Sequence, residues 1–258
     1  MQFDQNHAAA YSSGCQKVRA MSERWASANV YCPACGAGEI TKLGNNRPVA
    51  DFFCGRCDEI FELKSQSARI GRKVPDGAYV TMIQRITGDG NPNFLLLRYD
   101  KIELKVIELE VIPKHLFYPS MIERRKPLGP AARRAGWEGC NIILDGIPGS
   151  GRIALVRTGT VVPRQDVMRA WRSTLFVRSQ HSLTAKGWLL NVMRSIERLG
   201  QREFSLNDIY DSVGEFRALY PNNRNIEAKI RQQLQTLRDH GRLEFLGHGH
   251  YRVRQGDV

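Results

Sequence analysis

Residues 51–64 read Asp-Phe-Phe-Cys-Gly-Arg-Cys-Asp-Glu-Ile-Phe-Glu-Leu-Lys, and this stretch decides the fold of the first part of the chain. Its two ends are short apolar segments, which predict strands over 49–53 and 60–64. A Cys-x-x-Cys pair lies between the two segments. This pair makes the predicted strands neighbours in a hairpin, so position 51 is expected to lie opposite the residues around position 62.

The pair is the second of two in the chain. The four cysteines follow the spacing C-x2-C-x18-C-x2-C, and they are Cys32, Cys35, Cys54 and Cys57. That spacing favours zinc, because two such knuckles deliver four thiolates to a tetrahedral ion without strain. Four thiolates leave no position for water, so we predict a structural Zn²⁺ ion. A redox-active dithiol is the alternative.

Charged residues interrupt the two predicted strands at Asp51, Glu62 and Lys64, where a buried charge needs a reason. Glu62 and Lys64 are two residues apart on one strand and therefore share a face. The hairpin brings Asp51 opposite them. An aspartate followed about ten residues later by Glu-x-Lys is the active-site layout of metal-dependent nucleases of the PD-(D/E)xK type.

Such a site would bind Mg²⁺ through Asp51, Glu62 and the main-chain carbonyl of Leu63, because hard cations prefer oxygen ligands. The ion would stabilise the transition state of phosphodiester hydrolysis. Lys64 would orient the attacking water, help to deprotonate it or neutralise developing charge. A buried structural ion pair between Lys64 and Glu62 or Asp51 is the alternative interpretation.

The chain has 258 residues, of which 42% are hydrophobic and 25% are charged, so it can form one large globular domain or two ordinary ones. The net charge of +12 and the pI of about 9.7 favour a polyanionic partner, above all nucleic acid. The segment from Lys114 to Arg178 contains twelve basic residues and four acidic ones. The alternative is a basic face that is merely solvated.

No apolar run approaches the roughly 20 residues that cross a bilayer, so no membrane partner is expected. The first fifteen residues lack the basic start and apolar stretch of a signal peptide. Without a secretion signal, paired cysteines favour metal binding in a reducing compartment. We therefore expect a cytoplasmic protein, and we expect it to be monomeric in solution.

The first part of the chain, residues 1–181, is predicted to be a mixed α/β domain. Besides the hairpin, its pattern indicates a helix over 13–29, a turn over 88–92 and a helix over 78–86 with Asp76 as its N-cap. Further strands are expected over 94–99, 103–112, 141–144 and 152–156.

Residues 182–258 are predicted to form a winged helix-turn-helix domain. The pattern indicates a helix from about residue 182 to Gly200, a second helix with a capping box at 205–208 and a third over 225–240. Two short strands over 242–254 then form the wing. Trp188 and Phe245 are expected to be core residues.

The third helix of this domain has two distinct faces. Its apolar stripe consists of Ile226, Ile230, Leu234 and Leu237. Its opposite face carries residue types that make bidentate contacts to base edges in the major groove: Arg224, Arg231, Gln232, Gln235 and Arg238. The wing adds His248, His250 and Arg252 for phosphates or the minor groove. A winged helix that contacts protein is the alternative.

A second candidate for DNA contact lies in the first domain, in a loop rich in basic residues. It contains Arg124, Arg125, Lys126, Arg133, Arg134 and the adjoining Trp137. These cations suit a loop that follows a phosphate backbone. Trp137 would press an apolar surface against a base or a methyl group, or it would be buried.

Short strings spread over nearly the whole chain identify a family. They are Tyr-Cys-Pro-Ala-Cys-Gly (31–36), Asn-Asn-Arg-Pro-Val-Ala-Asp (45–51), Phe-Glu-Leu-Lys-Ser (61–65), Asp-Gly-Ala-Tyr (76–79), Arg-Lys-Pro-Leu (125–128), Ala-Arg-Arg-Ala-Gly-Trp (132–137) and Lys-Ile-Arg-Gln-Gln-Leu-Gln (229–235). In content and order, these strings resemble those of the DpnI-like methyl-directed restriction endonucleases.

The resemblance implies cleavage of double-stranded GATC whose adenine is N6-methylated, with Mg²⁺ required. It also implies a zinc-containing nuclease domain followed by a winged helix. The active-site residues of the family fall on Asp51, Glu62 and Lys64, with Ala50 where a proline is usual. A non-enzymatic regulator with a zinc ribbon and a winged helix, and a repair or structure-specific nuclease, are the competing hypotheses.

Overall fold

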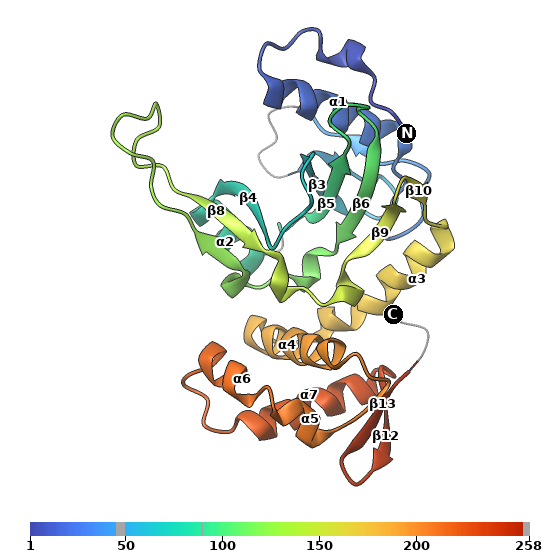
Figure 1. Cartoon of the computed structure of the whole chain (residues 1–258), viewed down its shortest axis with the longest axis vertical. Helices are drawn as coiled ribbons and strands as arrows, with labels where there is room; N and C mark the ends of the chain where they lie inside the picture. Colours follow the sequence, from blue (N-terminus) through green and yellow to red (C-terminus); the bar gives the residue numbers. More distant parts are fainter. Residues whose placement is uncertain (45–49, 89, 255–258) are drawn as a thin grey trace. The chain divides into compact units, whose positions relative to one another are not determined.

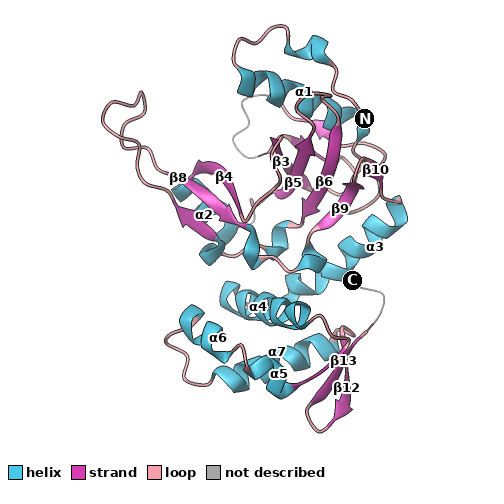
Figure 2. Ribbon diagram, viewed as in Figure 1, coloured by secondary structure: helices cyan, strands magenta, loops and turns pink. Residues whose placement is uncertain are grey.

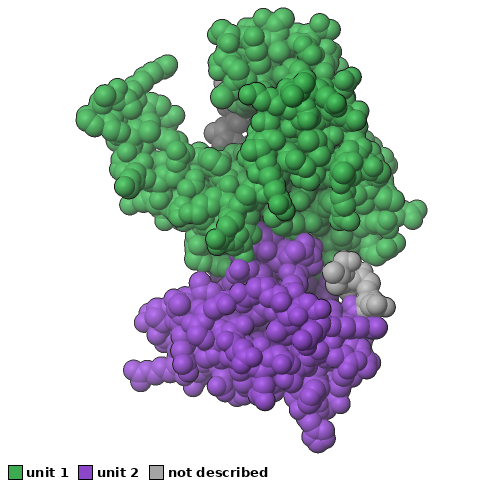
Figure 3. Space-filling view, in the orientation of Figure 1, with its two compact units in different colours: residues 1–145, 151–174 green, residues 146–150, 175–258 purple. Residues whose placement is uncertain are grey.

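The computed structural model describes residues 1–44, 50–88 and 90–254, and the chain divides into two compact units (Figures 1 and 3). Unit 1 comprises Met1–Asp145 and Gly151–Thr174, and unit 2 comprises Gly146–Ser150 and Leu175–Val258. Each unit has its own buried core and is described by itself. The division into domains at residue 182 stays a prediction.

Unit 1 is built on a large mixed sheet (Figure 2). Among the described residues its strands are, in spatial order, β1 (Thr41–Lys42), β2 (Phe52–Phe53), β3 (Ile60–Gln66), β5 (Asn93–Tyr99), β6 (Val106–Ile112), β9 (Ile153–Arg157) and β10 (Thr160–Val161). β3 and β5 run parallel, and the other neighbouring strands are antiparallel. β5 lies in the middle of this sheet, which explains its buried apolar run from Phe94 to Leu97.

A smaller antiparallel sheet in unit 1 has the order β4-β8-β7 and consists of β4 (Lys73–Ala78), β8 (Gly139–Ile143) and β7 (Ile122–Arg124). Helix α2 (Tyr79–Thr87) packs against it. The loop between β7 and β8 extends away from the sheet (Figure 1). We call residues 124–137 of this loop and its base the basic arm, since they carry the predicted DNA-contacting cations.

Helices cover the large sheet. α1 (Gly14–Asn29) contacts β1 and β3, and it buries Met21, Trp25 and Ala26. α3 (Arg164–Thr174) contacts β9. The short 3-10 helices of the described residues are η1 (Gln5–Ala8), η2 (Lys114–Leu116), η3 (Pro119–Met121), η4 (Leu144–Gly146), η5 (Gly149–Gly151) and η6 (Leu175–Ser179).

Unit 2 consists of a helical group and a small antiparallel sheet of order β11-β13-β12 (Figures 1 and 2). Its elements are α4 (Leu183–Leu199), β11 (Glu203–Ser205), α5 (Leu206–Tyr210), α6 (Val213–Leu219), α7 (Ile226–Asp239), β12 (Leu243–Gly247) and β13 (His250–Val253). Ser182 caps α4, and Gly200 ends it in the left-handed conformation at φ 63°. The predicted capping box of Ser205 and Asp208 is present. Trp188 stacks on Tyr220 in the core, with ring centroids 4.0 Å apart.

The mixed α/β first unit, the four-cysteine cluster and the helical second unit confirm the predicted fold class. Some elements differ. Asp76 does not cap a helix: it lies in β4, and the residue before α2 is Ala78, whose side chain makes no capping bond. An Asp-Gly pair is a local turn signal, whereas β4 exists because it pairs with β8, more than sixty residues later. Val49 and residue 89, which belong to a predicted strand and turn, lie outside the described residues.

A second difference concerns Phe245, which was predicted to be buried. It is 47% exposed and lies on β12, where its ring contacts Tyr251. Trp188 is buried as predicted, and so is the whole apolar stripe of α7. Phe245 lies on a short hairpin strand, where the residue pattern alone does not tell the packed face from the solvent-exposed face.

We expect replacement of Leu95 by alanine to lower the free energy of unfolding by about 2–5 kcal/mol, because it removes a fully buried side chain from the central strand. Calorimetry of unit 1 melting measures this loss. The matched control is Ile102→Ala in the turn after β5, where the side chain is 94% exposed and the change should stay within about 0.5 kcal/mol. Equal melting of the two variants would contradict this account of the core.

Candidate active site

The four cysteines converge to a compact cluster in unit 1. Sγ of Cys32 lies 3.6 Å from that of Cys57, and the Cys35–Cys54 distance is also 3.6 Å. All four sulfurs lie within 4.8 Å of one another. Four thiolates at about 2.3 Å from a tetrahedral zinc ion would be about 3.8 Å apart, so this donor set fits zinc. In the described part of the chain it is the one cluster of its kind.

The cluster connects β2 to β3. Cys54 and Cys57 lie in the turn between these strands, where the Cys54 N–H donates to the Glu59 carbonyl at 2.9 Å. β2 pairs antiparallel with β3, and Phe52 lies opposite Phe61. The predicted hairpin is therefore confirmed.

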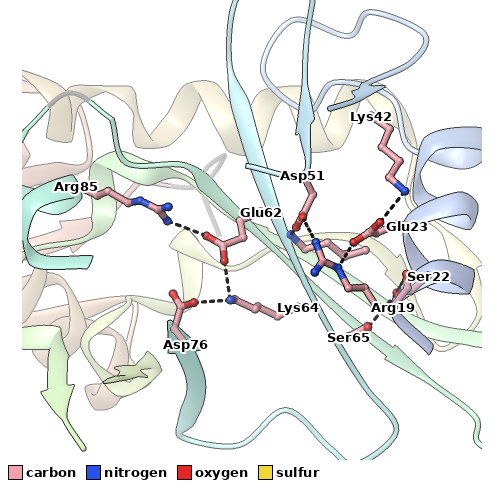
Figure 4. A network of polar contacts seen from close by, with 11 residues as sticks. Arg19, Ser22, Glu23, Lys42, Asp51, Glu62, Lys64, Ser65, Asp76 and Arg85 are labelled. Atoms are coloured by element: carbon pink, nitrogen blue, oxygen red, sulfur yellow. Dashed lines mark hydrogen bonds and ion pairs between the residues drawn. The ribbon is translucent and has the colours of Figure 1, made fainter. Parts of the chain in front are cut away.

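Asp51 lies directly before β2 and reaches the middle of β3. Its N–H donates to the Phe61 carbonyl at 2.9 Å, and its Oδ2 accepts from the Leu63 N–H at 2.8 Å. Its Oδ1 lies 3.4 Å from Nη2 of Arg19 on α1. Arg19 in turn pairs with the buried Glu23, which also binds Lys42 at 2.8 Å (Figure 4).

Glu62 and Lys64 lie on the other face of β3 from Ser65, which contacts Ser22 of α1. Nζ of Lys64 lies 2.6 Å from Oε1 of Glu62. The same ammonium lies 2.5 Å from Oδ1 of Asp76 on β4.

Arg85 on α2 approaches Oε2 of Glu62 at 3.6 Å and completes a group of two cations and two carboxylates (Figure 4). The side chains of Asp51, Glu62 and Lys64 are 17%, 16% and 21% exposed, so solvent reaches each of them.

Burial and neighbouring charges shift the pKa values of these groups. Burial raises the pKa of Asp51, although the Leu63 N–H and Arg19 oppose the shift. Burial also raises the pKa of Glu62, with Lys64 acting against it. For Lys64, burial lowers the pKa, but Glu62 and Asp76 outweigh it, so the pKa is raised overall and the side chain is an ammonium ion.

The oxygens around β3 fit a divalent cation. Glu62 Oε2 is buried and accepts no hydrogen bond from any residue in the described ranges. The N–H and C=O of one strand residue point to the same side, so the Leu63 carbonyl faces the edge at which Asp51 lies. Two carboxylates and a carbonyl are ligands that Mg²⁺ accepts. The carboxylate of Asp51, however, is engaged with Leu63 and Arg19 and not with the lysine.

Sequence reasoning missed Asp76, Arg85, Arg19 and Glu23, which surround the predicted triplet. The sequence did contain a signal for the strand that carries Asp76. Val74 and Asp76 alternate on either side of Pro75, and a proline within such a pattern is typical of an edge strand. The two helical residues Arg19 and Glu23 are four apart, as in many surface pairs, and nothing in the pattern of α1 singles them out.

The basic arm presents most of its predicted residues to solvent. Arg125, Lys126 and Arg133 are exposed. Arg134 stacks on Trp137, with its guanidinium carbon 4.5 Å from the ring centroid, and Arg124 pairs with Glu138 at 2.7 Å. Trp137 is half-buried, and a β-carbon on Gly139 would meet its ring at 2.9 Å. Gly139 therefore leaves room for the indole against the start of β8.

In unit 2, the predicted reading residues are all exposed: Arg224, which lies shortly before α7, and Arg231, Gln232, Gln235 and Arg238 on the helix. Arg231 donates to the hydroxyl of Tyr210 at 2.7 Å, and Gln232 accepts from Lys229. In the wing, His248 and His250 are exposed. Arg252 is half-buried between Glu203 and Glu244, so it is less available than the other predicted contacts.

Comparison with protein-family models gives two matches. A model described as DpnI, the Dam-replacing family, matches residues 1–180, and a model described as DpnI_C, the Dam-replacing HTH domain, matches residues 184–253. No helix among the described residues is both long and apolar enough to cross a bilayer.

Proposed function

The chain belongs to the DpnI or Dam-replacing family of methylation-dependent restriction endonucleases, and on that premise we propose that it cleaves double-stranded GATC containing N6-methyladenine with the help of Mg²⁺. We assign the nuclease to residues 1–181 and a DNA-reading winged helix to residues 182–258. One observation carries the proposal. The Lys64 ammonium contacts Glu62, and the N–H of Leu63 between them donates to Asp51, so the three predicted residues meet on β3.

In this proposal, Asp51, Glu62 and the Leu63 carbonyl hold the divalent cation. When bound, the cation polarises the scissile phosphate and lowers the charge barrier to attack by water. Lys64 contributes a fixed positive charge that stabilises the negative charge growing on the phosphate oxygens. Because two carboxylates surround its ammonium, Lys64 acts as an electrostatic and orienting group.

Two features favour an enzyme over a DNA-binding regulator. A regulator has no use for two partly buried carboxylates around one lysine, since an ion-pair group of this kind costs about as much in desolvation as it returns. The side chains of Asp51, Glu62 and Lys64 also keep 16–21% of their surface exposed. A purely structural ion pair needs no such access.

DNA recognition is assigned to both units. On α7, the exposed arginines and glutamines would contact base edges in the major groove, while the wing would contact the backbone. The basic arm would follow phosphates with its arginines and place Trp137 against the DNA. A methyl group is a small apolar target, and one pocket distinguishes its presence by a few kcal/mol at most. Two reading units would multiply this discrimination.

The enzyme is expected to cleave a plasmid with methylated GATC sites in the presence of Mg²⁺ and to leave the unmethylated plasmid intact. Asp51→Ala should lower the single-turnover rate by about 10³-fold or more, on the order of 4 kcal/mol of transition-state stabilisation. Gel assays with and without Mg²⁺ measure both effects. Asp166→Ala on α3, at a 49% exposed side chain, is the control. Equal cleavage of the two plasmids would remove the proposal.

Replacement of Gln235 by alanine is expected to weaken binding to a methylated GATC duplex by about 1–3 kcal/mol, because it removes a base-edge contact. Binding to a scrambled duplex at the same salt concentration should hardly change. Titration of labelled duplexes by fluorescence anisotropy measures both affinities. Gln201→Ala, at an exposed position before β11, is the matched control. A uniform loss on both duplexes would assign Gln235 to the backbone instead.

The four-cysteine cluster is proposed to hold one Zn²⁺ ion per chain. Cys54→Ser should release the ion and lower the free energy of unfolding of unit 1 by about 3 kcal/mol or more, about 6–12 °C in Tm, because it breaks the connection between β2 and β3. Metal analysis and thermal melting measure the two effects. Cys15→Ser, at an exposed cysteine outside the cluster, should retain the zinc. Metal-free wild-type protein with unchanged melting would contradict the assignment.

A further inference from the structure

Asp76 is a buried carboxylate at the candidate site to which the proposed hydrolysis assigns no role. Its side chain is 3% exposed, and its Oδ1 lies 2.5 Å from Nζ of Lys64. Glu62 approaches the same ammonium at 2.6 Å, so Lys64 is held between two carboxylates (Figure 4). One carboxylate comes from the large sheet and the other from the β4-β8-β7 sheet.

The backbone of β4 aims Asp76 at this point. In the ladder with β8, Asp76 pairs with Cys140 and Ala78 pairs with Gly139, so Gly77 is an extra residue in β4. A bulge of this kind bends the strand and redirects a side chain. The Gly77 N–H also donates to Asp76 Oδ1 at 2.6 Å, which fixes the carboxylate from its own backbone.

The second oxygen of Asp76 argues against a purely structural role. Oδ2 is buried and accepts no hydrogen bond from the residues that the structure describes. A carboxylate kept only for stability is normally satisfied at both oxygens, because an unpaired buried acceptor is costly. The contact with Lys64 therefore explains why Asp76 is buried.

Lys64 needs a second anchor if Glu62 binds a cation. The lysine stem is flexible, so the position of its ammonium depends on the groups that hold it. A carboxylate that shares its charge with a divalent cation attracts a neighbouring ammonium less strongly. Asp76 approaches Lys64 from another strand and keeps its charge for the lysine.

We propose that Asp76 is a positioning residue that holds the Lys64 ammonium beside the scissile phosphate while Glu62 binds the divalent cation. This inference rests on the proposed nuclease function. Asp76 acts through Lys64 and not on the DNA itself.

The test compares single-turnover cleavage of a methylated GATC duplex by wild type, Asp76→Asn, Lys64→Ala and the double variant. We expect Asp76→Asn to lower the rate about 10–100-fold, while affinity for the duplex without divalent cation changes less than about twofold. In the Lys64→Ala background, the same substitution should lower the rate no further, because residues that act as one unit are not additive.

Glu123→Gln is the matched control for these measurements. Glu123 accepts a hydrogen bond from Lys73 at 2.6 Å and lies on β7 of the same sheet as Asp76, but its side chain is 42% exposed and remote from the triplet in sequence. The control should cleave at the wild-type rate. A rate loss equal to that of Asp76→Asn would show that any disturbance of the β4-β8-β7 sheet slows cleavage, and it would overturn the inference.

A second readout is independent of cleavage. In metal-free wild-type protein labelled on lysine nitrogen, the Lys64 ammonium is assigned by its loss in Lys64→Arg. It should exchange its protons slowly and show a scalar coupling across the hydrogen bond to the Asp76 carboxylate carbon, and Asp76→Asn should lose both. Absence of this coupling in wild-type protein overturns the inference, whether or not any variant folds.

The two ideas fail in different ways. If wild type cleaves no methylated DNA with Mg²⁺, the proposed function fails and the positioning role fails with it. If wild type cleaves and Asp76→Asn cleaves equally fast, the nuclease stands and the role of Asp76 is overturned. The same holds if Asp76→Asn slows Lys64→Ala by the factor seen in wild type.

Discussion

The pairing of β2 with β3 is the constraint on which the candidate site depends. In the described residues this pairing joins Phe52 to Phe61 and Phe53 to Ile60, which is too little to be stable alone. A zinc ion in the cysteine cluster would supply the missing restraint, because two of the cysteines lie in the connecting turn and two precede β1. Because β3 is also held by its long parallel pairing with β5, a slip of one residue between β2 and β3 would move Asp51 away from Leu63. The proposed zinc site would therefore fix the register that places Asp51 against Leu63.

Charge balance explains how so many ionic side chains coexist in a small volume. Each carboxylate lies beside a cation. Asp51 contacts Arg19, and Glu62 contacts Lys64 and Arg85. These cations come from α1, β3 and α2, so elements far apart in the sequence must pack before the charges are satisfied. Glu62 has the most demanding position, because burial raises its pKa and two other carboxylates act in the same direction. A site of this kind is held by the fold and cannot form from the triplet alone.

The parts of the molecule that sequence predicts well are those set by local rules. Cysteine spacing, the alternation of β3, the capping box at Ser205 and Asp208 and the apolar stripe of α7 are each set by short, local sequence patterns. The position of Asp76 does not follow from local rules, because it depends on pairing with a strand near residue 140 and on a bulge at Gly77. The positions of Arg85 and Arg19 do not follow from local rules either. Their roles depend on which distant strand each helix packs against, and local periodicity does not specify that.

The cations of the molecule fall into two physical classes, and the difference separates the proposed DNA-reading residues from the proposed active-site lysine. Arg231 and Arg238 on α7 make solvent-exposed contacts with Tyr210 and Asp239. Contacts of this kind contribute about 0–1 kcal/mol, so phosphates or base edges can replace them at little cost. Lys64 is instead held, with only 21% of its side chain exposed, between two carboxylates, and its charge is compensated by both of them. DNA can therefore redirect the surface arginines while the ammonium at the site stays where the two sheets hold it.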